Sequence, residues 1–528
     1  MTALSPPEGP VRLASRLRGV GGWRRWACAF GLGATGALAL PPLYGLPALV
    51  VAFTGLVWLL DGAHRPRQAF WLGWWFGFGY LTVSLYWIAA ALFVDIASFW
   101  WLLPFTVTGL PALLAGATGL ATWAAWMVAP RGWPRILALA AGWGLGEWVR
   151  VWAFSGFPWN LVGQVWGVTD ATLQAASVVG IQGLGMVAVF AAAAPAALAD
   201  RAARGRWLPL LAGAVAVAVL LAFGFLRLVD APDGTVPGVR LRLVQASIPQ
   251  ELKWRPGARD AILQRHLELS RAPGFDAVTH VVWPETAGPS FLDRDASRRA
   301  ALATAVPAGG LLLTGTNRTT PQPTDPPQVW NAVQALDGTG RVLASYDKAH
   351  LVPFGEYLPM RAVLGRLGMS KVTAGSIDFS AGPGPRTLTL PGLPPVGPLI
   401  CYEVLFPAEV VESGQRPSWL LNLTNDGWYG RTAGPYQHLE IARARAVEEG
   451  LPVVRSANNG ISAVFDAFGR TRGRLGLDAV GVLDVELPQA ADPTAFGRFG
   501  QSIPLSMVAL GFLSAFLLRR RRPAALQD

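Results

Sequence analysis

The sequence predicts a polytopic α-helical membrane domain of about eight spans joined to an α/β domain. First, 52% of the 528 residues are hydrophobic and only 15% are charged, whereas soluble chains carry about 25% charged residues. Second, apolar runs of about 17–25 residues, long enough to cross a bilayer, dominate residues 26–229 and return near 503–518. Third, residues 230–500, between these membrane-length runs, contain short apolar runs of strand length that alternate with helical patterns. A single soluble domain is therefore excluded.

The predicted spans are residues 26–40, 45–60, 69–92, 99–128, 134–154, 171–198, 207–229 and 503–518. Pro104 and Pro111 lie in the fourth, so we expect a kink or an interfacial start there. The N-terminus does not resemble a cleavable signal peptide, because further apolar runs follow closely and no small-residue cleavage site stands out.

The positions of the arginines predict how the spans are oriented in the membrane. With eight spans, every positive cluster falls on one side of the membrane, which the positive-inside rule assigns to the cytoplasm. We therefore expect both termini in the cytoplasm and the α/β domain on the opposite side of the membrane. The net charge of +11 reflects these orientation signals, so no nucleic-acid partner is predicted. The clusters are the N-terminal arm, Arg65 and Arg67, Arg131 and Arg135, Arg201, Arg204 and Arg206, and Arg519 to Arg522.

The predicted domains are a membrane domain of about seven spans at residues 1–229, an external α/β domain at 230–500, and a final span with a basic tail at 501–528. In the external domain, strands mixed with helices favour an α/β layered fold. Helices are expected at 259–270, 292–306 and 436–450. Strands are expected at 239–248, 279–283, 311–316, 331–336, 399–400, 419–423, 453–456 and 461–465.

Three polar residues stand at the ends of short apolar runs: Glu285, Lys348 and Cys401. Taken singly, each has a structural interpretation, as a strand-end charge, a solvated loop cation and a small buried hydrophobe. The only other cysteine is Cys28, expected on the opposite side of the membrane. A thiol left unpaired in an oxidising compartment is better explained by reactivity than by packing.

If folding brings the three side chains together, their chemistry is that of nucleophilic acyl transfer. The thiolate is the nucleophile, so we expect the pKa of Cys401 to fall from about 8.5 beside an ammonium group. The ammonium group of Lys348 can also stabilise an oxyanion together with the backbone N–H that follows Cys401. The Glu285 carboxylate can take the thiol proton and return it to the leaving group.

Four segments carry a family resemblance: WPET at 283–286, YDKAHLVPFGEY at 346–357, ICYEVLFP at 400–407 and NLTNDGWYG at 422–430. They resemble the nitrilase superfamily, and together with eight spans the whole chain resembles the apolipoprotein N-acyltransferase family. The resemblance implies that the α/β domain folds as an α-β-β-α sandwich and that the enzyme transfers an acyl group by a ping-pong mechanism. It also implies that Glu285 is the general base, Lys348 the stabiliser of the oxyanion and Cys401 the nucleophile.

The resemblance further implies four supporting residues. Glu356 matches a second glutamate that positions Lys348 and the substrate. Tyr402 and Glu403 match the residues after the nucleophile, with the Tyr402 backbone N–H as an oxyanion donor. Trp254 matches a tryptophan near the substrate entrance, or else is a packed surface aromatic.

The implied acyl donor is a phospholipid, with phosphatidylethanolamine as the expected one, and the acceptor is a diacylglyceryl-cysteine apolipoprotein. Both are held in a bilayer by two fatty chains, and extracting them would carry a large hydrophobic cost. An active site anchored in the inner membrane avoids this cost. No cofactor or metal is predicted, because the five histidines lack ligand spacing. The membrane half favours a monomer.

Two other functions remain open at this stage. A membrane-tethered amidase of the nitrilase type would share the Glu-Lys-Cys set but would not need eight spans. A transporter or receptor would need charged residues along several spans. Away from the span ends, only Glu147 and Arg150 are charged.

Overall fold

The computed structural model describes residues 8–129, 132–200, 205–253, 255–288, 291–320, 324, 328–367, 369–372 and 377–520. The chain divides into two compact units. Unit 1 holds residues up to Tyr86, Leu102–Asp230 and the chain from Arg498, and unit 2 holds Trp87–Trp101 and Ala231–Gly497. Residues 87–101, which the sequence assigned to the membrane half, thus group with the α/β unit. Trp254, Arg131, Arg201, Arg204, Arg521 and Arg522, singled out above, lie outside the described residues.

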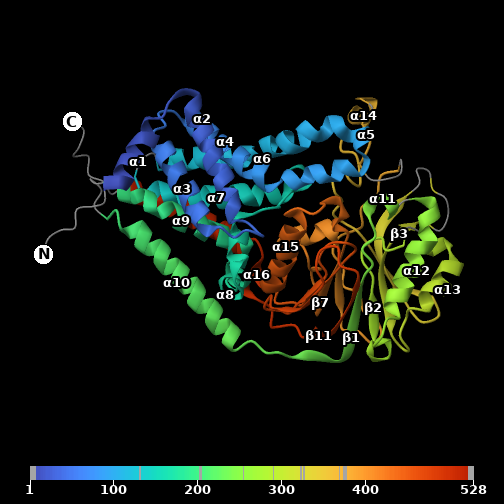
Figure 1. Ribbon diagram of the computed structural model, residues 1–528. Helices are drawn as coiled ribbons and strands as arrows, with labels where there is room; N and C mark the ends of the chain where they lie inside the picture. Colours follow the sequence, from blue (N-terminus) through green and yellow to red (C-terminus); the bar gives the residue numbers. More distant parts are fainter. Residues whose placement is uncertain are drawn as a thin grey trace, which may run out of the picture. The chain divides into compact units, whose positions relative to one another are not determined.

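Unit 1 is helical, and each of the eight predicted spans overlaps a helix (Figure 1). Its helices are α1 (Glu8–Gly19), α2 (Gly22–Gly36), α3 (Leu46–Asp61), α4 (Pro66–Ser84), α6 (Leu110–Val128), α7 (Pro134–Trp152), α8 (Asp170–Leu173), α9 (Ala176–Ala193), α10 (Leu208–Val229) and α17 (Ser502–Arg520).

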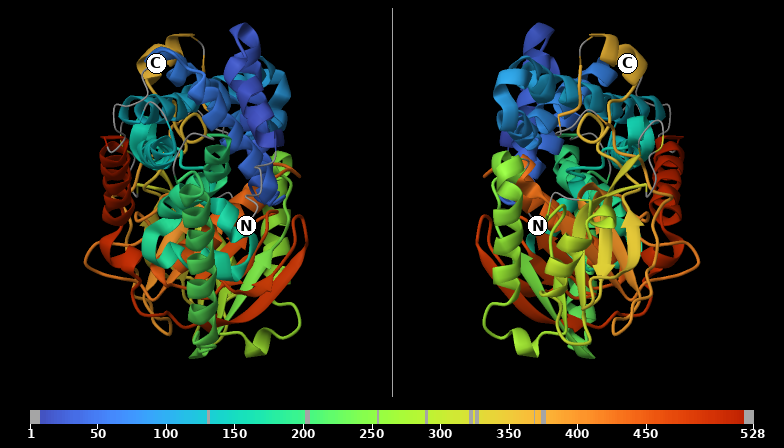
Figure 2. Two further views of the ribbon diagram at one scale, coloured as in Figure 1. Left: turned by 90° about the vertical axis from the view of Figure 1, so that its left-hand side faces the viewer. Right: turned by 90° about the vertical axis from the view of Figure 1, so that its right-hand side faces the viewer.

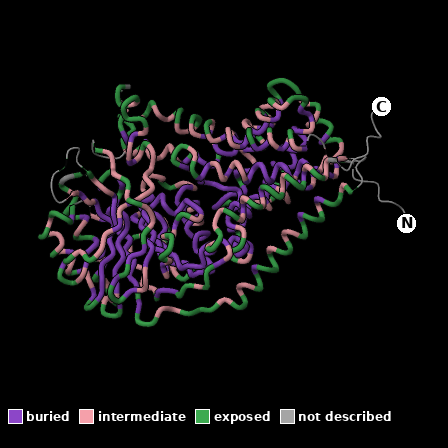
Figure 3. Tube along the Cα trace, turned by 180° about the vertical axis from the view of Figure 1, so that it is seen from behind, coloured by how far each residue is buried: buried purple, intermediate pink, exposed green. Residues whose placement is uncertain are grey.

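Among the described residues, four stretches are long and apolar enough to cross a membrane: Phe105–Val128, Ala176–Ala199, Leu208–Val229 and Ser502–Arg519. The pair Pro66–Ser84 and Tyr86–Leu102 makes a fifth if it is counted as one span bent by 49°. The count of eight therefore stays a prediction. α10 is one uninterrupted helix (Figure 2), and most of its residues are exposed (Figure 3).

Two predicted spans differ from single helices. The predicted span at 69–92 is not one continuous helix, since α4 ends at Ser84 and a 3-10 segment, Tyr86–Asp95, follows. The range 99–128 has the irregular start that its prolines predicted. A π-helical turn at Phe105–Gly109 follows Pro104, and regular α-helix begins at Leu110.

Helices α4 and α6 are held together by small residues. A Cβ added at Gly73 would lie 2.0 Å from Thr122 Oγ1, and one at Gly77 would lie 1.8 Å from Thr118 Oγ1. The threonine hydroxyls donate across the helix pair, from Thr118 to the Gly73 carbonyl at 2.9 Å and from Thr122 to the Ala69 carbonyl at 2.7 Å. Such close contacts drive helix association in lipid, where burial of apolar surface contributes little.

Unit 2 contains two β-sheets. One has the strand order β11-β1-β2-β3-β4-β5 and the other β10-β9-β8-β7-β6. The strands are β1 (Thr235–Gln245), β2 (His280–Val282), β3 (Leu311–Thr319), β4 (Val329–Leu336), β5 (Val342–Asp347), β6 (Val396–Ile400), β7 (Trp419–Thr424), β8 (Val453–Ala457), β9 (Ala463–Phe465), β10 (Thr471–Arg474) and β11 (Gly481–Pro488). The helices are α5 (Ile96–Phe99), α11 (Gln250–Lys253), α12 (Arg259–Ser270), α13 (Ala296–Ala303), α14 (Arg361–Leu364), α15 (Gly434–Glu449) and α16 (Ala495–Phe499), whose last residues pass into unit 1.

Side-chain alternation builds the layers of this unit. Leu241 and Leu243 of β1 point into a core shared with Trp419 and Leu421 of the second sheet. Val244, on the opposite face of β1, packs against α12 and α13. Helix α15 covers the other sheet, which gives helix, sheet, sheet, helix in order (Figure 1). The α-β-β-α sandwich implied by the resemblance is thus the architecture observed.

The expected helix at 259–270 matches α12, and those at 292–306 and 436–450 correspond to α13 and α15. The expected strands correspond to β1–β4 and β6–β9. β5, β10 and β11 were not anticipated. Their side chains are largely exposed or half-buried, so they lack the apolar runs by which buried strands are recognised.

Candidate active site

The site residues follow the carboxyl ends of strands in both sheets. β6, β7 and β8 are parallel, and Cys401 comes directly after β6. In the other sheet β5 runs in the same direction as β2 and β3, because it pairs antiparallel to β4, which pairs antiparallel to β3. Glu285 follows β2 and Lys348 follows β5. Carboxyl ends of parallel strands are the usual place for a ligand site in open α/β sheets.

Cys401 sits at a sharp turn between β6 and the 3-10 helix Cys401–Leu405. Its φ of +50° is in the left-handed region, which costs a non-glycine residue about 1–3 kcal/mol and persists only when the surroundings enforce it. One restraint is Glu403, whose Oε2 accepts the Ile400 N–H at 2.7 Å. The thiol is buried, with 6% of the residue exposed.

The side-chain amide of Asn331 links two of the predicted residues, Glu285 and Glu356, and Glu356 links them to Lys348. Asn331 of β4 donates from Nδ2 to Glu285 Oε1 at 2.7 Å and to Glu356 Oε1 at 3.0 Å. Glu356 Oε2 in turn forms an ion pair with Lys348 Nζ at 2.9 Å. All four residues are buried. The structure thus brings together Glu285, Lys348 and Glu356, although they are far apart in sequence.

Gly315 of β3 makes room for the Glu285 segment. A Cβ at this position would lie 2.6 Å from Glu285 Cα, from the Pro284 carbonyl oxygen and from the Thr286 nitrogen. Backbone atoms cannot give way as a flexible side chain can. The absence of a side chain at Gly315 therefore fixes how closely Glu285 approaches the sheet.

The expected lowering of the Cys401 pKa does not occur in the resting site. Burial and the charge of Glu285 raise the pKa of this thiol to about 12, although the Lys348 ammonium acts in the opposite direction. The prediction was wrong because it weighed only the ammonium and left out burial and the nearby carboxylate. Cys401 rests as a thiol, so its attack on a carbonyl requires a base.

Glu285 and Lys348 have the protonation behaviour that this chemistry needs. Burial raises the pKa of Glu285, and Lys348 only partly offsets the effect. Burial favours a neutral Lys348, but the carboxylates of Glu356 and Glu285 outweigh it, so the pKa of Lys348 rises above its usual range. Lys348 is therefore a permanent cation, and Glu285 is a base strengthened by its surroundings.

Glu403 and Tyr402 brace the turn from the other side. Glu403 Oε1 accepts from the Tyr346 hydroxyl and from the Ala349 N–H, both at 2.7 Å. Since Tyr346 and Ala349 flank Lys348 in the chain, this carboxylate ties the Lys348 segment to the Cys401 turn. The Tyr402 ring is buried and packs edge-on against Phe406 at 5.3 Å between centroids.

Sequence reasoning missed Asn331 and Lys253. Lys253 is 2% exposed and donates to the Glu285 carbonyl oxygen at 2.9 Å. Burial lowers the pKa of Lys253 to about 8, while the nearby Glu285 and Cys401 oppose this shift. The signal that could have found Asn331 is its place among the apolar residues of a predicted strand, since a buried amide needs polar partners.

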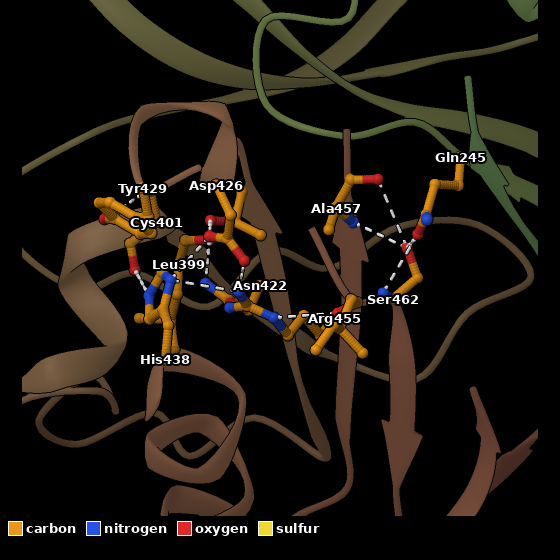
Figure 4. Close-up of polar contacts among 12 residues, drawn as sticks. Gln245, Leu399, Cys401, Asn422, Asp426, Tyr429, His438, Arg455, Ala457 and Ser462 are labelled. Carbon is orange, nitrogen blue, oxygen red and sulfur yellow. Dashed lines mark hydrogen bonds and ion pairs between the residues drawn. The ribbon is translucent and has the colours of Figure 1, made fainter. Parts of the chain in front are cut away.

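A second group of missed residues lies behind Cys401 (Figure 4). Asp426 and Arg455 form a fully buried ion pair at 2.6 Å, and His438 contacts both. The Cys401 Sγ lies 3.8 Å from the hydroxyl of Tyr429. Tyr429 in turn packs edge-on against Trp87, at 4.7 Å between ring centroids. Trp87 belongs to residues 87–101, which explains why that segment groups with unit 2.

In the part of the chain that the structure describes, no group of three or more His, Cys, Asp or Glu side chains is arranged to hold a metal ion.

The sequence matches two family models. Residues 32–194 match the apolipoprotein N-acyltransferase N-terminal domain, and residues 240–495 match the carbon-nitrogen hydrolase family. Among solved structures, an amidase from Nesterenkonia sp. aligns at 22% identity over 48% of this chain and 92% of its own, with a TM-score of 0.35.

Relatives align over nearly the whole chain. The apolipoprotein N-acyltransferase of Rhodopseudomonas palustris is 40% identical, over 97% of this chain and 98% of its own. That of Bradyrhizobium diazoefficiens is 43% identical, over 95% of this chain and 96% of its own. On this similarity, which spans both units, the chain belongs to the apolipoprotein N-acyltransferase family.

Proposed function

We propose that this protein transfers a fatty acyl chain from a phospholipid to the N-terminal amine of a diacylglyceryl-cysteine apolipoprotein, through a thioester on Cys401. Family membership supports the reaction, and the buried group of Glu285, Lys348, Glu356 and Cys401 supports the chemistry. The observation that carries the proposal is the chain of contacts from Glu285 through Asn331 and Glu356 to Lys348. It fixes a base and a cation whose charges both act on the Cys401 thiol.

In the first half-reaction the Cys401 sulfur attacks the sn-1 ester carbonyl of the donor. Glu285 takes the thiol proton as the carbon–sulfur bond forms. The negative charge that develops on the ester oxygen is stabilised by Lys348 and by the backbone N–H of Tyr402. The carbon–oxygen bond then breaks, and Glu285 protonates the departing lysophospholipid alkoxide. Glu356 holds Lys348 in position throughout.

In the second half-reaction the neutral α-amine of the apolipoprotein attacks the thioester. Glu285 accepts a proton from the attacking nitrogen and returns it to the departing Cys401 sulfur. The products are the N-acylated lipoprotein and the resting thiol. Because the thioester also reacts with water, a dry, lipid-filled site favours transfer over hydrolysis.

The proposed donor is phosphatidylethanolamine, and the enzyme acts as a monomer in the bacterial inner membrane. In this proposal residues 1–229 and 501–528 anchor the catalytic domain, residues 230–500, on the periplasmic side, with both termini in the cytoplasm. Arginine placement supports this orientation. Trp254 is proposed to lie near the substrate entrance.

The test is incubation of the purified protein with phospholipid labelled in its sn-1 acyl chain. The proposal expects an adduct on the wild type that hydroxylamine releases, since hydroxylamine cleaves thioesters, and no such adduct on Cys401→Ser. If no adduct forms and a soluble amide is hydrolysed instead, the protein is an amidase, the second candidate. The carbon-nitrogen hydrolase match over residues 240–495 is the observation that favours that alternative.

A further inference from the structure

The backbone carbonyl of Cys401 is bound from behind the site. His438, on α15, places Nε2 at 3.2 Å from the Cys401 carbonyl oxygen (Figure 4). This peptide group joins Cys401 to Tyr402. In a trans peptide the C=O and the N–H point in opposite directions. Holding the Cys401 carbonyl toward His438 therefore aims the Tyr402 N–H away from it.

The neighbours of the imidazole determine which nitrogen carries hydrogen. A carbonyl oxygen only accepts hydrogen bonds, so Nε2 must be the donor in this contact. Nδ1 lies 3.1 Å from Arg455 Nη2, which only donates, and 2.9 Å from Asp426 Oδ1. Burial, followed by the charge of Arg455, lowers the pKa of His438. A neutral ring with hydrogen on Nε2 accepts from Arg455 at Nδ1. A hydrogen bond from Nδ1 to Asp426 would require a second hydrogen, on Nδ1. In both forms Nε2 donates to the Cys401 carbonyl.

Arg455 and Asp426 fix the ring in turn. Asp426 binds Arg455 Nη2 through Oδ2 at 2.6 Å, and Arg455 Nη1 donates to Asn422 Oδ1 at 2.6 Å. Asp426, His438 and Arg455 are each at most 2% exposed. A buried polar group of this kind, with its members bonded to one another, is rigid. It also comes from three separate elements: the turn after β7, α15 and β8.

We propose that His438 is a positioning residue that sets the orientation of the Cys401–Tyr402 peptide group, and so aims the Tyr402 N–H at the oxyanion. Asp426 and Arg455 act through it by holding the ring. The inference rests on the proposed function, in which that N–H stabilises the tetrahedral intermediate. It also accounts for the left-handed φ of +50° at Cys401, because the turn is held on one side by Glu403 and on the other by His438.

Comparing two reactions of the Cys401 sulfur distinguishes a positioning role of His438 from a general effect on folding. Acylation by phospholipid passes through an oxyanion, whereas alkylation by iodoacetamide does not. Both rates are measured at Cys401 by mass spectrometry, at one pH, in a Cys28→Ser background. For His438→Leu we expect acylation to fall about 100-fold, the loss that follows removal of one oxyanion donor, with little change in alkylation. His438→Gln keeps an N–H donor and should recover part of the acylation rate.

Arg445→Met is the matched control. Arg445 also lies on α15 and is also in a buried ion pair, with Glu448 at 2.9 Å, and this pair is not part of the His438 network. It should lower thermal stability without changing the ratio of acylation to alkylation. If His438→Leu does not accumulate as folded protein, Asp426→Asn replaces it. That variant should acylate more slowly but alkylate as fast or faster, because the Asp426 charge raises the pKa of Cys401.

The inference is overturned if acylation and alkylation fall in parallel in the His438 or Asp426 variants, or if their ratio matches that of Arg445→Met. Failure of the proposed function looks different, since the wild type itself would then form no acyl adduct.

Discussion

Lys348 Nζ lies 2.9 Å from Glu356 Oε2, so the cation is paired directly with Glu356 and connects to Glu285 through Asn331. Removing one member of a buried ion pair leaves an uncompensated charge, which costs about 3–5 kcal/mol. Lys348→Met and Glu356→Gln should each lower the thermal midpoint. The double variant should lose less stability than the sum of the two, as measured by thermal unfolding in detergent. Additive losses would show that the two side chains do not interact.

The Asn331 amide bridges two carboxylates, so its replacement should lower both the stability and the acylation rate. In Asn331→Leu both Glu285 and Glu356 lose a donor, and unmade buried hydrogen bonds cost about 1–3 kcal/mol each. We expect the acylation rate to fall by about 10- to 100-fold. Asn331→Asp should be slower still, because repulsion from a third carboxylate keeps a proton on Glu285, which then cannot take the thiol proton. An Asn331→Asp variant faster than Asn331→Leu would contradict this arrangement.

Cys401 should behave as a protonated thiol across neutral pH. Its pKa is raised to about 12. Below that pKa the reactive thiolate fraction grows about tenfold per pH unit. The rate of alkylation by iodoacetamide should thus climb with pH and reach no plateau below about pH 10. Lys253, whose pKa is about 8, loses its charge in this range, which should make the rise shallower above about pH 8.

The measurement is alkylation mapped to Cys401 by mass spectrometry, with Cys28 replaced by serine. A plateau near pH 7 would mean that the free enzyme holds a thiolate, and that the base assigned to Glu285 is not needed for attack.

Gly315→Ala should displace Glu285, because the new Cβ would meet backbone atoms of residues 284–286 at 2.6 Å. We expect acylation to fall by at least about tenfold, because a displaced base no longer reaches the proton. Gly338→Ala is the matched control, since a Cβ there meets no atom within 4 Å. Acylation rates of the two purified variants, each divided by its folded fraction, provide the comparison. Equal rates would show that Gly315 does not position the base.

Glu285 and Cys401 could be predicted from the sequence because each follows a short buried strand. Lys348 follows β5, which is mostly half-buried and was not predicted as a strand. It was singled out with the segment YDKAHLVPFGEY. Asn331 and His438 lie inside elements, where a polar residue looks like an ordinary member of a strand or helix. Their roles depend on partners from other elements, such as the Cys401 carbonyl facing His438.

The pKa of Cys401 in the resting site could not be predicted from the sequence, for a related reason. A nearby lysine can be proposed from motifs, but the degree of burial and the nearness of Glu285 arise only in the folded chain. The same limit applies to residues 87–101. Their apolar composition predicts membrane helix, whereas Trp87 donates to Gln437 at 2.9 Å and packs with the α/β unit.

In the proposed reaction the Cys401 sulfur carries the acyl chain from the phospholipid to the apolipoprotein. Intact-mass measurement of the wild type after exposure to phospholipid should show one added acyl chain, mapped to Cys401. Addition of a diacylglyceryl-cysteine peptide should remove that mass and produce an amide-linked acyl group on the peptide amine. An added mass on any other residue, or an adduct that persists while the peptide stays unmodified, would contradict the account.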